Sequence, residues 1–213
     1  MEQPLKVCKK SMFWRGLLAF ALGCLCFIVS QPLTRLPLLG YLQGTVAVTV
    51  FSQTSTVLFL VLVALSAGVF EEGFRFLFKT LLLRPAKAPF SQPLLFGLGH
   101  GLTEAAIILV SAFLQGYTLG DLWLGIIERF LAVICQVCMT VIVFNGFQIG
   151  RRWLYLLFAV LVHGLVDFVL PLMALSGISV LIVEAAFVVM LVPLVIYAAR
   201  SKKYYGKGEI QNA

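Results

Sequence analysis

Residues 54–83 read TSTVLFLVLVALSAGVFEEGFRFLFKTLLL, and this stretch decides the fold. A helix needs about 20 mostly apolar residues to span the hydrocarbon core of a bilayer. The stretch is longer than that, so we expect a transmembrane helix that is tilted or that emerges from the bilayer. Two glutamates and an arginine lie within it, namely Glu71, Glu72 and Arg75. The stretch therefore predicts a membrane-spanning helix that carries charge.

The whole chain has the composition of a membrane protein. Of its 213 residues, 61% are apolar and only 12% are charged, which is about half the charged share of a soluble domain. A soluble fold of this size could not hide so much apolar surface in one core. The net charge of +7 could suggest nucleic-acid binding, but the basic residues form short clusters between apolar runs, as in membrane proteins. We therefore expect membrane lipids, and no nucleic acid, as partners.

Apolar runs recur along the chain, and each must form a helix because lipid offers no water to free backbone groups. The sequence thus predicts an all-α polytopic membrane protein with about six transmembrane helices. It is expected to form a single domain over residues 1–213, with a core motif region at about 54–171. The semi-polar segment 41–51 is interpreted as a loop, a re-entrant piece or the start of the second span. The predicted spans are residues 13–30, 54–83, 93–114, 122–144, 153–170 and 178–199.

The basic clusters predict the orientation of these helices. They fall on every second connection, whereas the opposite connections hold only Arg35 and Asp121. Because cytoplasmic loops carry the excess of lysine and arginine, both termini are expected in the cytoplasm. The lack of an organelle signal favours a bacterial plasma membrane. The clusters are Lys6, Lys9, Lys10 and Arg15; Lys79, Arg84 and Lys87; Arg151 and Arg152; and Arg200, Lys202, Lys203 and Lys207.

Several titratable residues lie inside the predicted spans, where a charge costs about 2.5–3.5 kcal/mol at the bilayer centre. At about 1.5 Å of rise per residue, His100 lies roughly 12 Å, His163 roughly 15 Å and Glu72 roughly 18 Å from a span end. The hydrocarbon core is about 30 Å thick, so residues from three helices reach the midplane and predict one site. The titratable residues in the spans are Glu71, Glu72, Arg75, His100, Glu104, Glu128, Arg129, His163, Asp167 and Glu184.

Helical spacing places several of these residues in pairs, each on one helix face. The midplane cluster would hold four carboxylates against Arg75 and two imidazoles, and protonation or a bound cation must relieve the excess negative charge. Such groups could activate water through a bound metal or through a buried glutamate that acts as general base. The pairs are Glu71 and Arg75, Glu72 and Arg75, His100 and Glu104, and His163 and Asp167.

Two features also have a structural interpretation. Polar residues can simply hold helices together in lipid, and this alternative applies above all to Glu128, Arg129 and Glu184. The glycines at 97, 99 and 101 on both sides of His100 would let another helix approach closely, or would leave room for a substrate backbone.

Four short motifs along residues 71–167 resemble a known family. Residues 71–75, EEGFR, resemble the E-E-x-x-R motif of the CAAX-protease and bacteriocin-processing (CPBP) superfamily of intramembrane proteases. Residues 97–105, GLGHGLTEA, resemble the G-H-G-x-x-E segment of the YhfC family of intramembrane metalloproteases. Glu128 and Arg129 resemble the E-R that opens the next motif of that family, and residues 163–167, HGLVD, resemble its closing H-x-x-x-D.

The resemblance implies roles for these positions. Glu71 or Glu72 would activate water, while the histidines would bind a metal, Zn²⁺, or the oxyanion. The family carries a histidine eight residues after the glutamate of its E-R pair, whereas this chain has Gln136, a poorer metal ligand. The implied catalytic residues are Glu71, Glu72, Arg75, His100 and His163. The implied metal ligands are His100, Glu104, His163 and Asp167.

The sequence therefore predicts an intramembrane peptidase, a hydrolase that cleaves a membrane-embedded or lipid-adjacent peptide. One alternative is a non-catalytic scaffold or immunity-type protein that keeps the polar core for structure. Another is a proton- or cation-coupled transporter, since carboxylates at the midplane also serve that role. A transporter is expected to show inverted repeats with broken helices, and no such symmetry is visible in the sequence.

Overall fold

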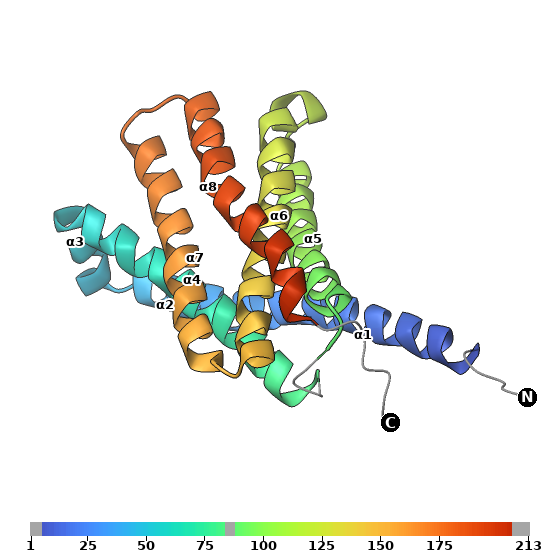
Figure 1. Ribbon diagram of the computed structural model, residues 1–213. Coiled ribbons are helices and arrows are strands. Elements are labelled where there is room, and N and C mark those ends of the chain that lie inside the picture. The colour runs from blue at the N-terminus through green and yellow to red at the C-terminus, as the bar shows by residue number, and fades with distance from the viewer. Residues whose placement is uncertain (1–5, 84–87, 206–213) are drawn as a thin grey trace, which may run out of the picture.

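The computed structural model describes residues 6–83 and 88–205, with side chains from residue 13 onward. Predictions about Arg84, Lys87 and Lys207, and about the side chains of Lys6, Lys9 and Lys10, lie outside the described residues. Every regular element within these ranges is helical (Figure 1). In chain order they are α1 (Lys6–Ser30), the π-helical turn η1 (Gln31–Arg35), α2 (Leu36–Gln43), α3 (Val46–Thr54), α4 (Thr56–Leu81), α5 (Ser91–Leu114), α6 (Leu119–Ile149), α7 (Arg152–Leu175), α8 (Val180–Arg200) and the 3₁₀ turn η2 (Ser201–Tyr204).

Six helical segments in the described residues are long and apolar enough to cross a membrane, which confirms the predicted all-α architecture and number of spans. The largest differences in boundaries concern the first and fourth spans. The fourth covers the whole of α6, beyond the predicted range 122–144 at both ends. The first continues through η1 to the end of α2. The segment 41–51 holds the end of α2 and the first part of α3, a separate helix before α4.

The first span continues past residue 30 because a π-helical turn accommodates Pro32. Proline has no N–H and interrupts the α-helical ladder, so in lipid the freed carbonyls need another donor. The Ser30 hydroxyl donates at 3.2 Å to the carbonyl oxygen of Phe27, which lies five residues before Pro32. The Thr34 hydroxyl donates to the next exposed carbonyls of the turn, those of Val29 and Ser30. The chain thus remains helical, and Arg35 lies within a transmembrane segment. The prediction that Arg35 belongs to a loop was wrong.

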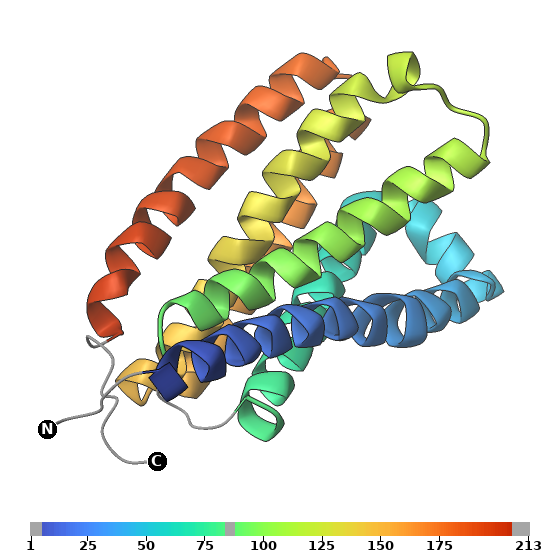
Figure 2. The same ribbon diagram turned by 90° about the vertical axis from the view of Figure 1, so that its right-hand side faces the viewer.

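The helix α6 lies at the centre of the fold. It contacts α5, α7 and α8, while α1 packs on α5 and α4 packs on α7 (Figures 1 and 2). Residues 138–146 of α6 are all buried. The buried core includes Phe96, Met139, Ile142 and Phe144, which come from α5 and α6. The central position of α6 lets its polar residues reach side chains on several other helices.

Glycines allow α1, α5 and α6 to approach closely. A Cβ atom at Gly99 would lie 2.1 Å from the backbone oxygen of Phe20 on α1. A Cβ atom at Gly97 would lie 2.6 Å from the Cα atom of Val137 on α6. No side chain larger than a hydrogen fits at these contacts without separating the helices. The geometry therefore supports the helix-packing interpretation for Gly97 and Gly99.

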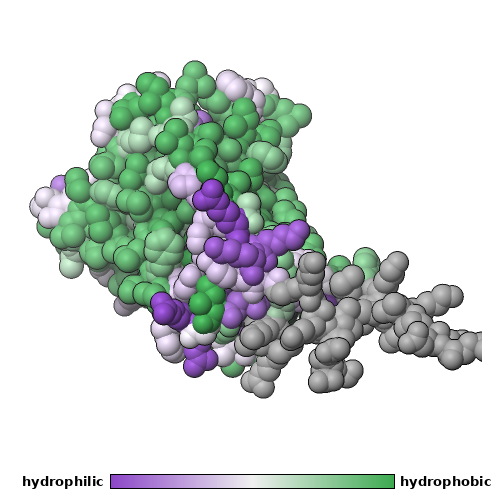
Figure 3. Space-filling view, in the orientation of Figure 1, coloured by the Kyte–Doolittle hydropathy of each residue, from purple (hydrophilic) through white to green (hydrophobic). Residues whose placement is uncertain are grey.

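The outer surface is apolar over most of the view in Figure 3, as lipid contact requires. Phe130 and Val189, for example, expose 68% and 70% of their surface. Hydrophilic surface gathers near the ends of α6 and α8 (Figure 3). The turn from α6 to α7, the C-terminal end of α4 and the C-terminal end of α8 lie at the same end of the molecule (Figures 1 and 2). The described basic residues at these helix ends therefore share one side.

Lys79 departs from the predicted basic cluster. It is buried, and its ammonium donates to the Leu83 carbonyl oxygen at 3.0 Å and to Gln92 Oε1 at 2.7 Å. The same ammonium lies 5.3 Å from the ring centroid of Phe144. Lys79 thus joins the end of α4 to the start of α5 and to α6, instead of facing solvent.

The Gly99→Ala substitution should lower the thermal unfolding temperature of the detergent-purified protein. The methyl group would overlap the α1 backbone, and such overpacking costs about 1–3 kcal/mol. The matched control is Gly73→Ala on α4, where a Cβ atom would meet nothing within 4 Å. Equal unfolding temperatures for the two variants would contradict the close contact between α1 and α5.

Candidate active site

Glu71 is the most highly connected carboxylate of a buried group that we call the polar cluster. Its Oε1 accepts a hydrogen bond from Gln31 Nε2 at 2.5 Å. Its Oε2 lies 2.9 Å from His100 Nε2 and accepts from Gln136 Nε2 at 3.0 Å. Arg75 Nη2 lies 3.4 Å from the same oxygen. The polar cluster comprises Gln31, Glu71, Glu72, Arg75, His100, Glu104, Gln136, His163 and Asp167.

Glu72 uses only one of its two carboxylate oxygens. Its Oε1 accepts from Arg75 and lies 2.6 Å from His163 Nδ1. Its Oε2 is buried and has no hydrogen-bond partner among the described residues. On the other side of the imidazole, His163 Nε2 lies 3.6 Å from Asp167 Oδ2 and 3.9 Å from Glu71 Oε1. Glu72 is thus held through one oxygen while the other is free to accept.

Glu104 extends the polar cluster along α5 and α6. Its Oε2 accepts from Gln136 Nε2 at 2.6 Å, and its Oε1 accepts from Arg129 Nη1 at 3.1 Å. Arg129 also donates to Glu128, which is partly exposed. Glu184 on α8 has a buried Oε2 without a partner and joins none of these hydrogen bonds. The Glu128 and Arg129 pair therefore borders the polar cluster, while Glu184 stands apart from it.

Two residues of the first span contribute to the site, and the sequence analysis missed them. Gln31 reaches Glu71, and its Oε1 accepts from Arg35 Nη1 at 3.1 Å. Arg35 is fixed in turn by Ser66 Oγ at 3.0 Å and by the Val63 carbonyl oxygen at 2.9 Å, both on α4. One signal was present in the sequence, since Gln31 and Arg35 stand four residues apart at the end of an apolar run.

The charge balance differs from the prediction. Besides Arg75, the guanidinium groups of Arg129 and Arg35 lie at the two edges of the polar cluster. The excess of negative charge is therefore smaller than the sequence predicted, since the prediction counted Arg75 as the one arginine beside the four carboxylates. Burial is nearly complete at the centre of the polar cluster, where Glu72, Arg75 and His100 expose 0% and Glu71 exposes 4% of their surface, whereas the Asp167 side chain at its edge exposes 39%. Breaking a buried ion pair by removing one partner typically costs about 3–5 kcal/mol, so these contacts hold one another in place.

The structure gathers a possible metal-binding group that differs from the implied ligand set. Ligand atoms of Glu71, His100 and Glu104 all lie within 4.8 Å of one another. His163 and Asp167, which the resemblance implies as ligands, instead approach each other and Glu72. Carboxylate oxygen and imidazole nitrogen are ligands that Zn²⁺ takes, and catalytic zinc sites use three protein ligands. The donor types and number of this group therefore match those of a catalytic zinc site, while the Gln136 amide donates to both of its carboxylates.

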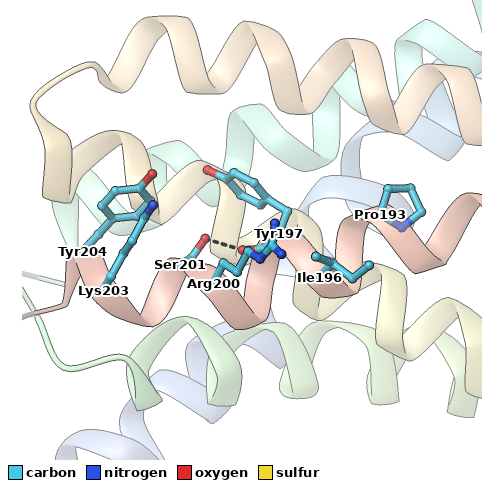
Figure 4. A pocket seen from close by; sticks show the side chains of 7 residues that line it. All are labelled: Pro193, Ile196, Tyr197, Arg200, Ser201, Lys203 and Tyr204. Carbon is cyan, nitrogen blue, oxygen red and sulfur yellow. Dashed lines mark hydrogen bonds between the residues drawn. The ribbon is translucent and has the colours of Figure 1, made fainter.

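Two cavities lie at the basic end of the molecule. One, of about 340 Å³, is formed by the end of α8 and by η2 (Figure 4). The other, of about 430 Å³, is lined by residues 150–154 at the turn between α6 and α7. Neither lining includes a residue of the polar cluster, so these cavities do not open onto Glu71 or Glu72. The first is lined by Pro193, Ile196, Tyr197, Arg200, Ser201, Lys203 and Tyr204.

Comparison with known proteins gives one family. The family described as YhfC intramembrane metalloprotease matches residues 6–123 and 109–192 of the chain. These ranges contain every residue of the polar cluster. No curated protein and no solved structure matches the chain.

The Gln31→Ala substitution should destabilise the protein by about 1–3 kcal/mol, because it leaves Glu71 Oε1 buried without its close donor. Reversible unfolding in mixed micelles would measure the difference in the free energy of unfolding. Gln43→Ala, at the exposed end of α2, is the control and should be close to wild type. A Gln31→Ala variant as stable as this control would show that the first span does not support Glu71.

Proposed function

The chain belongs to the YhfC intramembrane metalloprotease family, and from this we propose that it is a peptidase whose base is Glu72. The substrate is a membrane-embedded or membrane-adjacent peptide. The observation that carries the proposal is the free, buried Oε2 of Glu72 within a cluster that also holds two histidines from other helices. The EEGFR motif supports a place for the family within the wider CPBP superfamily.

Glu72 suits the role of general base better than Glu71. All described donors to Glu72 meet its Oε1, which Arg75 and His163 fix in direction. Both oxygens of Glu71 already accept hydrogen bonds, one from Gln31 and the other from Gln136. A base must have an oxygen within reach of the proton that it removes. Glu71 therefore positions its neighbours, and Glu72 acts on water.

The reaction follows from these positions. Glu72 Oε2 takes a proton from water as the water oxygen bonds to the peptide carbonyl carbon. The carbonyl oxygen becomes an oxyanion, which N–H donors of His100, His163 or Arg75 can stabilise. Protonated Glu72 then gives the proton to the departing amide nitrogen, and the C–N bond breaks. The base is regenerated, and one water has been added across the peptide bond.

A zinc ion would be held by Glu71, His100 and Glu104. When bound, such an ion supplies Lewis-acid activation of water or of a peptide carbonyl. His163, Asp167 and Arg75 would then orient the base and its neighbours through the contacts described above.

A specific observation favours a second candidate, a non-catalytic membrane scaffold. Most carboxylate oxygens of the polar cluster already have protein donors, and the amide of Gln136 joins two of them. A polar core of this kind could serve only to fix the helices. The two candidates differ in whether Glu72 must be ionisable for function.

The Glu72→Gln substitution should reduce cleavage at least about 100-fold, since general base catalysis contributes that much or more. New N termini of membrane proteins would be quantified by mass spectrometry in cells that express wild type or variant. Glu184→Gln, also a carboxylate with a partnerless oxygen, is the matched control and should cleave normally. Wild-type cleavage by a folded Glu72→Gln variant would remove Glu72 as base. Fragments that do not depend on the wild-type protein would favour the scaffold.

We also propose that both termini face the cytoplasm of a bacterial plasma membrane, because the described basic helix ends share one side. Green fluorescent protein fused after residue 213 should therefore fluoresce, since it matures in the cytoplasm. A fusion in the connection between α7 and α8, at residue 177, should stay dark. A dark fusion at residue 213 together with a fluorescent fusion at residue 177 would show that the termini lie on the opposite side of the membrane.

A further inference from the structure

The side-chain amide of Gln136 lies where the ligands of the candidate metal group meet. Its Nε2 donates to Glu71 Oε2 at 3.0 Å and to Glu104 Oε2 at 2.6 Å. Its Oε1 accepts from Arg75. An amide nitrogen has two N–H donors, and here each is used on one carboxylate. Gln136 thus links the two carboxylates of the candidate metal group.

A metal ion and this amide cannot occupy the group together. Zinc binds carboxylate oxygens at about 2.0–2.2 Å. The amide nitrogen already lies within 3.0 Å of one carboxylate oxygen of each of these two glutamates. An ion bound between Glu71 and Glu104 would meet that nitrogen, which carries hydrogens and offers no lone pair for coordination. The two N–H groups of the neutral amide thus donate hydrogen bonds to the carboxylates of Glu71 and Glu104, in the place where a cation would balance their charge.

The packing around Gln136 holds the amide in this position. A Cβ atom at Gly101 on α5 would lie 3.1 Å from Gln136 Cβ and 3.0 Å from Val133 Cα. A Cβ atom at Gly97 would lie 3.1 Å from the Gln136 backbone oxygen. The α5 backbone therefore lies directly against the base of the side chain, and only 6% of Gln136 is exposed. The base of the side chain is thus fixed, and the amide beyond it is held by its hydrogen bonds to Glu71, Glu104 and Arg75.

We propose that Gln136 is an amide clamp that excludes divalent cations from the group formed by Glu71, His100 and Glu104. The clamped protein therefore has little affinity for zinc. The proposal rests on the proposed function, because it assumes that the polar cluster is the site of a peptidase. Its test is metal binding, whereas the test of the proposed function is cleavage that depends on Glu72. Either test can therefore fail while the other succeeds.

The test is zinc binding by the full-length, detergent-purified protein, measured by isothermal titration and by metal analysis after dialysis. Gln136→Ala removes the amide, and near-isosteric Gln136→Glu replaces the N–H donors with a third carboxylate. Both should bind zinc about tenfold or more tightly than wild type: replacing a residue next to metal ligands changes affinity on this scale, and here the change is a gain because the N–H donors between the carboxylates are removed. Zinc should also raise the thermal unfolding temperature of Gln136→Glu and leave that of wild type unchanged.

Two controls make the result specific. Gln148→Ala removes another side-chain amide of α6, one that donates to the Ala88 carbonyl oxygen at 3.1 Å. It should bind zinc as wild type does. Adding His100→Ala to Gln136→Ala should abolish the gained binding, because only two ligands of the group, Glu71 and Glu104, then remain.

Several outcomes would overturn the proposal. Wild type that binds stoichiometric zinc as tightly as Gln136→Ala would show that the amide is no obstacle. Folded variants that gain no affinity would show that the group does not bind zinc. Binding gained by Gln136→Glu and not by folded Gln136→Ala would show that the site lacks a ligand and is not blocked. Gain that survives His100→Ala would place the metal elsewhere.

Discussion

Every charge buried between these helices must find its partner within the protein, because the hydrocarbon around them offers none. Glu71 meets this constraint with donors from four elements: η1, α4, α5 and α6. The relative positions of these four elements therefore depend on their contacts with the Glu71 carboxylate. Since an unpaired buried charge costs several kcal/mol, the polar cluster specifies how the apolar helices are arranged. Apolar contacts alone would specify this less well, because lipid solvates leucine as readily as a neighbouring helix does.

Close helix packing makes such short contacts possible. Gly23 and Gly99 bring α1 against α5, and Gly97 and Gly101 bring α5 against α6. His100 lies between these glycines on α5, where α5 packs closely against both α1 and α6. Its imidazole is therefore placed in the interior. On α4, Glu72 Oε2 is likewise enclosed and has no partner among the described residues. A reactive group can remain unsatisfied there because the neighbours that surround it cannot easily rearrange.

Much of the site could be predicted from the sequence because its signals were local. The four-residue spacing of His100 and Glu104 fixes a common helix face, and the depths of Glu72, His100 and His163 follow from a constant helical rise. Gln31 and Arg35 were not predicted because the first span was expected to end at residue 30, whereas the chain continues as a π-helical turn and a new helix. The pairing of Gln136 with Glu71 and Glu104 was beyond reach too, since it depends on how α6 packs against two other helices.

The π-helical turn in the first span also determines which face of the helix each later residue occupies. Such a turn holds about one residue more than an α-helical turn, and one residue corresponds to about 100° around the axis. If the same residues were wound as regular α-helix instead, everything beyond η1 would turn by that angle. Arg35 would then leave Ser66 and Val63, although no side chain at the polar cluster had changed its chemistry. Deletion of one residue within η1 would offset that rotation, so a related sequence that lacks one residue here should form a regular α-helix and present the same faces beyond it.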